Sequence, residues 1–77
     1  MYIDNPKEQI LQIDTSCNVK NDGNLTLYLV QEDNVKTLDV TNKSDLECSL
    51  SEFKEGYIYI RLQINDVKNV KAEITIK

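Results

Sequence analysis

Carboxylates, lysines and tyrosines are the residues left to carry any chemistry in this 77-residue chain, because it contains no histidine. The common Ser/His and Cys/His nucleophile pairs therefore cannot form. The aspartates that could act instead are dispersed at or beside polar turns: Asp22, Asp33, Asp39, Asp45 and Asp66. Catalytic acids and bases must converge on one reacting group, so dispersed carboxylates predict a protein that is not an enzyme.

The sequence also lacks the residues that usually form metal and cofactor sites. Cys17 and Cys48 are the only cysteines, and without histidine they cannot complete the usual zinc site. Neither "NDGN" nor "QEDN" matches a calcium-binding loop, and two glycines are too few for a phosphate-cradling loop. We expect no metal and no cofactor. The cysteines lie on apolar strand phases, and reduced thiols are favoured over a disulfide because no export signal precedes them.

Exposed aromatic residues offer a better functional signal. Tyr28, Tyr59 and Arg61 fall on the outward phases of expected strands, and Tyr with Arg is the composition enriched at protein interfaces. The alternative is that Tyr57 and Tyr59 pack locally and that Arg61, the only arginine, pairs with a neighbouring acid.

The segment "MYIDNP" adds two further candidates for a protein contact, Tyr2 and Ile3. Residues 1–8 could form a short edge strand or an arm that reaches a neighbouring molecule. The predicted protein-binding residues are therefore Tyr59, Arg61, Tyr28, Tyr2 and Ile3.

Composition limits the chain to one domain, residues 1–77, because a chain of this length can bury only one core. Thirteen acidic against nine basic residues argue against a nucleic-acid partner. No apolar run approaches the roughly 20 residues that span a bilayer, and no signal peptide is visible. We expect a protein partner and a location in a virion or the bacterial cytoplasm.

Strict alternation of apolar and polar residues is the main structural signal, and it predicts β-strands throughout. We expect strands near 11–19, 25–31, 35–41, 46–50, 57–64 and 70–77, with turns at 20–24 and 65–69. The first two should form a hairpin through "KNDGN". Six to seven such strands predict an all-β fold, a two-sheet antiparallel sandwich of immunoglobulin-like type, with a small open barrel as the alternative.

Two resemblances agree with that architecture. "LSEFKEGYIYI" resembles the tyrosine corner of immunoglobulin-like sandwiches, which implies Leu50 as a plug, Gly56 as the turn residue and Tyr57 or Tyr59 as the anchor. The order "GNLTLYLV", "LDVT", "CSLSEFKEGYIYIRLQI" and "VKAEITIK" resembles the C-terminal sorting domains of type IX secretion. That second resemblance implies a similar small β-sandwich.

Together these features predict a non-catalytic module that binds other protein surfaces. A small accessory protein of a phage particle, of the capsid decoration type, fits the composition best. The alternatives are a phage-encoded inhibitor of a host defence protein and a detached sorting or adhesion module. Strand order, partner identity and oligomeric state cannot be derived from the sequence.

Overall fold

The computed structural model describes residues 1–77 as six strands without a helix. No segment therefore forms a helix that could cross a membrane. The strands are β1 (Tyr2–Ile3), β2 (Ile10–Gln31), β3 (Asn34–Asp39), β4 (Leu46–Ser49), β5 (Gly56–Tyr57) and β6 (Tyr59–Ile76). They form two antiparallel sheets, a small one of β1 and β5 and a four-stranded one centred on β2. The predicted all-β, two-sheet class is thus confirmed.

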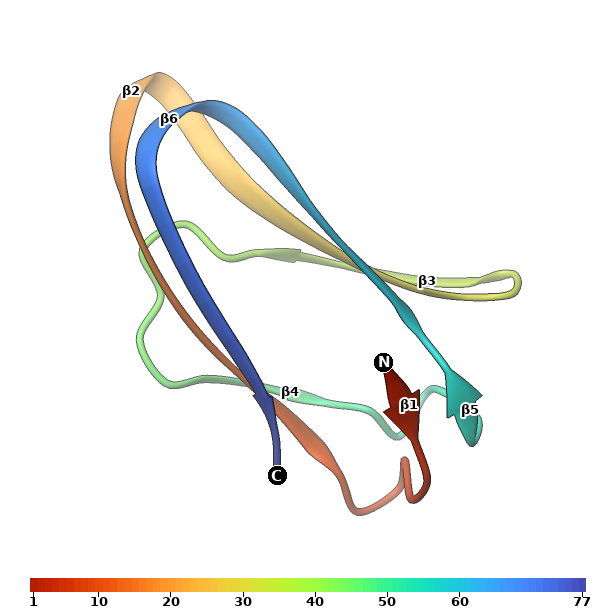
Figure 1. Cartoon of the computed structure of the whole chain (residues 1–77). Helices are drawn as coiled ribbons and strands as arrows, with labels where there is room; N and C mark the ends of the chain where they lie inside the picture. The colour runs from red at the N-terminus through yellow and green to blue at the C-terminus, as the bar shows by residue number, and fades with distance from the viewer.

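A long ribbon of β2 and β6 organises the larger sheet (Figure 1). The two strands pair antiparallel from Leu11 opposite Ile76 to Val30 opposite Tyr59, and both bend midway. The bend divides the sheet into two layers. The first layer holds β4, the first half of β2 and the second half of β6; the second layer holds β3, the second half of β2 and the first half of β6.

The predicted first hairpin is wrong, because residues 11–19 and 25–31 belong to one continuous strand, β2. The predicted turn at 65–69 likewise lies inside β6. The two turn-like segments lie opposite one another, where the β2–β6 register shifts between Val19 and Asn24. Residues that tolerate turns therefore bend a two-stranded ribbon here, as β-bulges do, and do not reverse the chain.

Backbone conformation explains the bend. Asn21, Asp66 and Asn69 all have positive φ angles, near +50°, a region that Asn and Asp enter more readily than most residues. Gly23 faces the backbone of β6 so closely that an added Cβ would lie 2.7 Å from the carbonyl carbon of Asp66. Only glycine allows the strands to approach this closely.

The core lies between the layers and is made of alternate residues, as the sequence pattern predicts. Its buried members are Ile3, Leu11, Ile13, Leu25, Leu27, Leu29, Val40, Cys48, Leu50, Phe53 and Ile58. Cys48 and the half-buried Cys17 are unpaired, so both are free thiols as favoured above.

The inward residues of β6 are less buried than predicted. Ile60, Leu62 and Ile74 are only partly covered, and Ile64 is 56% exposed. The reason is topological, because β6 has a neighbouring strand on one side only.

Side-chain amides hold the loop between β4 and β5 against the sheet. The Gln31 side chain donates to the Lys54 carbonyl and accepts from the Lys54 N–H, both at 2.7 Å. The Asn34 side chain donates to the Glu52 carbonyl at 2.8 Å. These bonds position Phe53, whose ring is buried in the core.

Candidate protein-binding face

Strand register brings three of the predicted residues together on the outer face of the second layer. Tyr28 of β2 lies between Thr37 of β3 and Arg61 of β6. Two residues along β2, Val30 lies between Val35 and Tyr59 in the same way. Cross-strand neighbours on one face are close enough for their side chains to touch, so these residues form one continuous surface.

The remaining two tyrosines extend this surface. Tyr57 and Tyr59 flank the buried Ile58, so strand alternation directs both side chains outward. Tyr2 lies opposite Tyr57 in the small sheet, and their rings meet edge to face with centroids 5.0 Å apart. All four tyrosines of the chain therefore contribute to one surface. We call it the tyrosine face: Tyr2, Tyr28, Val30, Val35, Tyr57, Tyr59 and Arg61.

The large side chains of this face are unusually exposed to solvent. Tyr59 is 77% exposed, Tyr57 73%, Val35 55% and Tyr2 51%. Tyr57 and Tyr59 also line a shallow depression of about 300 Å³, together with Gln31 and Lys54. The face thus combines large exposed side chains with a hollow that Tyr57 and Tyr59 line on one part and mainly polar and charged residues line on the rest.

Hydrogen bonds leave the tyrosine rings accessible. The Tyr28 hydroxyl donates to the Gln63 side chain at 2.9 Å, and the Tyr2 hydroxyl donates to the Glu55 carboxylate at 3.3 Å. The negative charge of Glu55 is the main reason that the pKa of Tyr2 is raised. Arg61 has no carboxylate within ion-pair distance, and the only salt bridge of the protein lies elsewhere, between Lys36 and Glu52 at 3.7 Å.

Two predictions about individual residues need correction. Ile3 is completely buried, so it belongs to the core and cannot form part of an exposed contact surface. The tyrosine corner is also absent: Leu50 is buried and Gly56 has a positive φ as expected, but Tyr57 and Tyr59 point into solvent. The buried aromatic of this loop is Phe53, which the alternation pattern did not identify.

Sequence reasoning also missed Val30, Val35 and Tyr57 as members of the face. Val30 and Val35 flank the turn at "QEDN" and pair directly across it. The short β2–β3 turn was a usable signal for this pair, since a tight turn fixes the register of its flanking strands.

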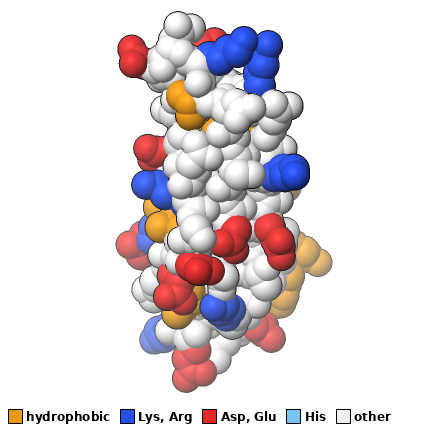
Figure 2. Space-filling model, turned by 90° about the vertical axis from the view of Figure 1, so that its left-hand side faces the viewer, with side chains coloured by type: hydrophobic (Ala, Val, Ile, Leu, Met, Phe, Trp, Pro, Cys, Tyr) orange, Lys and Arg blue, Asp and Glu red, His pale blue; other side chains and the backbone are white.

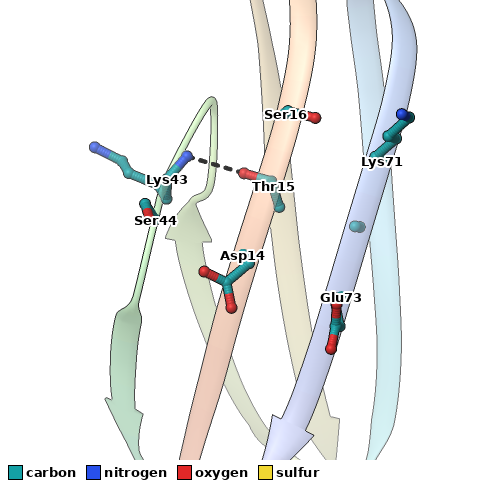
Figure 3. Close-up of a pocket in the computed structure, with 8 residues that line it drawn as sticks. Asp14, Thr15, Ser16, Lys43, Ser44, Lys71 and Glu73 are labelled. Carbon is teal, nitrogen blue, oxygen red and sulfur yellow. Dashed lines mark hydrogen bonds between the residues drawn. The ribbon is translucent and has the colours of Figure 1, made fainter.

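The outer face of the first layer has the opposite character. Acidic side chains gather over the lower half of the view in Figure 2. Strand register places Glu73 of β6 opposite Asp14 of β2 in this layer. A depression of about 320 Å³ crosses this face (Figure 3). Its charged lining residues are Asp14, Lys43, Lys71 and Glu73. We call this surface the charged face.

Neither face gathers a set of metal ligands. No group of three or more carboxylate or thiol side chains converges as metal ligands would. No protein-family model matches the chain, and no curated protein or solved structure matches it either.

Proposed function

We propose that this chain is a non-catalytic protein-binding module that docks through its tyrosine face. The observation that carries the proposal is the gathering of all four tyrosines, two valines and the only arginine on one exposed surface. Tyrosine and arginine dominate the energetic centres of protein interfaces, because each buries a large area and keeps a polar group available.

The charged face is an internal comparison for this interpretation. It lies on the same β2–β6 ribbon, but its outward residues are polar or charged: Gln12, Asp14, Ser16, Glu47, Lys71, Glu73 and Thr75. That composition is ordinary for a sheet face in contact with water. The tyrosine face departs from it within the same sheet, and contiguous exposed apolar surface commonly marks an interaction site.

A phage particle is the setting we propose for this binding, with the chain as an accessory structural protein of the capsid decoration type. An apolar face on a small rigid sheet suits docking to a repeated lattice, where many weak contacts combine. An immunoglobulin-like sandwich remains our prediction for the finer fold class. Co-sedimentation with purified phage particles at a fixed stoichiometry is the expected result, and its absence would remove this setting.

A second candidate function is inhibition of a host defence protein by surface mimicry. The charged face favours it, because Asp14, Asp45 and Glu73 form an acidic row that suits a basic target groove. The two candidates use opposite faces of the molecule, so mutations on each face separate them.

The test compares Tyr59→Ala/Arg61→Ala with Asp14→Asn/Glu73→Gln on the opposite face. Each purified variant is used to capture proteins from the host lysate and is titrated against the protein recovered by the wild type. Loss of a central interface residue costs about 2 kcal/mol, so we expect at least roughly 30-fold weaker binding for the first pair only. Unfolding curves check that both pairs remain folded. Unchanged binding by the folded Tyr59/Arg61 variant contradicts the tyrosine face, and loss restricted to the second pair supports the inhibitor.

A further inference from the structure

The second half of β6 has an open edge. β6 pairs with β2 alone, so its other side offers main-chain groups without a strand partner. The direction of these groups follows from the mutual hydrogen bonds between Ile10 and Lys77, at 3.2 and 2.9 Å. Main-chain groups alternate along a strand. Lys71 and Glu73 therefore direct their N–H and C=O toward β2, whereas Ala72 and Ile74 direct theirs away from it.

Ile58, the residue just before β6, shows that this side of the chain can accept a neighbouring segment. The Met1 amino group donates to the Ile58 carbonyl at 3.0 Å, and the Ile58 N–H donates to the Met1 carbonyl at 2.7 Å. β1 covers the edge only at this end. The edge from Val70 to Ile76 lies in the other layer and stays uncovered.

Charges along this edge are unbalanced within one chain. Glu73 lies directly opposite Asp14, and like charges in that position destabilise a sheet. The Asp14 carboxylate accepts hydrogen bonds only from the Asp45 N–H, at 2.8 Å, and from the Gln12 side-chain amide, at 3.4 Å. Neither Lys71 nor Glu73 forms an ion pair within the chain. Figure 3 shows both side chains standing along β6 beside the depression.

Only one register of a second copy places both Lys71 and Glu73 opposite residues of opposite charge. If the two β6 edges pair antiparallel about Ala72, Lys71 of each copy lies opposite Glu73 of the other. A register centred on Glu73 would place the two Glu73 carboxylates together. A register centred on Ile74 would place Lys71 opposite Lys77, again with like charges.

We infer that the protein self-associates through the second half of β6, paired antiparallel about Ala72 with the same strand of a second copy. Mutual main-chain hydrogen bonds join the two Ala72 residues and join Val70 of each copy to Ile74 of the other. Lys71 and Glu73 form the flanking ion pairs.

Shape is compatible with this pairing. Ala72 is exposed and carries the smallest side chain of the edge, so nothing obstructs the two-fold axis. Asn69, with a φ of +56°, ends the regular edge and limits the pairing to a short stretch. We therefore expect weak association that depends on concentration and on salt.

The first half of β6 offers a competing edge, at Ile60, Leu62 and Ile64. Pairing about Leu62 would align apolar residues but would place Arg61 opposite Gln63, without an ion pair. The charge complementarity found at Ala72 has no counterpart there, which favours the second half.

Sedimentation equilibrium of the purified protein at increasing concentration tests the inference. Lys71→Glu and Glu73→Lys each place like charges together, and we expect either to weaken association by about tenfold. The double variant Lys71→Glu/Glu73→Lys restores opposite charges and should return association to the wild-type level. Lys7→Glu, an exposed residue distant in sequence from the edge, makes the same change in net charge as Lys71→Glu and should have no such effect.

Amide hydrogen exchange locates the contact. Protection of the Ala72 and Ile74 amides should rise with protein concentration, while that of Ile60 and Leu62 should not. A chain that stays monomeric at every concentration overturns the inference, as does a double variant that associates no better than the single ones. Protection that rises only at Ile60 and Leu62 overturns it in favour of the other edge. The tyrosine face lies on the other layer, so this outcome is independent of the docking proposed above.

Discussion

Asp39 stabilises the start of the segment that leads from β3 in the second layer to β4 in the first. Its carboxylate accepts hydrogen bonds from the Thr41 N–H at 3.0 Å and from the Thr41 hydroxyl at 2.6 Å. The same hydroxyl accepts from the Leu25 N–H at 2.9 Å, which connects the turn to the centre of the sheet. The hydrogen bonds from Thr41 favour the charged carboxylate and so lower the pKa of Asp39 below its ordinary value of 3.8.

This lowered pKa makes stability depend on acid in a defined direction. The charged carboxylate is stabilised in the folded state, so the contribution is fully present above the ordinary pKa of 3.8 and is lost as the pH falls through the lower folded value. We expect Asp39→Asn to be less stable than the wild type near neutral pH and the difference to shrink below pH 3.8. Urea unfolding across the acidic range measures it.

Asp33→Asn is the matched control, since the Asp33 carboxylate accepts no hydrogen bond and lies exposed beside the β2–β3 turn. The difference in unfolding free energy between Asp33→Asn and the wild type should not shrink in the same way as the pH falls. A gap between wild type and Asp39→Asn that stays constant with pH would contradict the role of the Thr41 bonds.

At the scale of elements, the bend in the β2–β6 ribbon shows where sequence reasoning succeeded and where it stopped. Alternation correctly placed Leu25, Leu27 and Leu29 inward and Tyr28 outward. It could not distinguish a turn from a bend, because "KNDGN" supplies residues that tolerate a positive φ, which either needs and which Asn21 adopts in the bend. The deciding interaction is a long-range one, the close approach of Gly23 to the backbone at Asp66.

Membership of the tyrosine face was predictable only in part for the same reason. The outward phases of Tyr28, Tyr59 and Arg61 follow from local periodicity. Their contact across β2 and β6 depends on a register between segments far apart in the chain, which no local pattern specifies. Ile3 was misplaced because its burial depends on the pairing of β1 with β5.

Gly23→Ala tests the bend directly. A methyl group at this position overlaps the backbone of β6, so either the strands separate or the bend changes. Overpacking of this kind costs about 1–3 kcal/mol, and we expect a loss of unfolding free energy in that range by urea titration. Asn24→Ala, an exposed neighbour in the same bend, should change stability far less. Equal stability of the two variants would show that the approach at Gly23 is not required.

For the whole molecule, we expect the continuous ribbon to couple the folding of the two layers. Each layer takes half of β2 and half of β6, and both strands continue through the bend despite the register shift there. We therefore expect that the two outer faces can be altered separately and that the layers beneath them unfold together.

Ile13→Val measures this coupling. Ile13 is buried in the first layer, whereas the tyrosines that supply the fluorescence lie outside it: Tyr28 and Tyr59 in the second layer, Tyr2 and Tyr57 in the small sheet. Removal of one buried methyl group costs about 0.5–1.5 kcal/mol. We expect the fluorescence transition and the far-UV circular dichroism transition to shift together by that amount. A fluorescence transition left at the wild-type midpoint would show that the layers unfold independently.

The β2–β6 ladder also determines when the molecule can fold. Leu11 pairs with Ile76 and Ser16 with Lys71. The first half of the central strand therefore cannot complete its pairing until residues almost a full chain length away are available. Folds dominated by such distant pairings cross their barrier slowly, in milliseconds to seconds. During synthesis, β2 leaves the ribosome long before β6 exists and can pair only with β3 and β4. We expect the native ribbon to assemble only after β6 has been synthesised, in one late step.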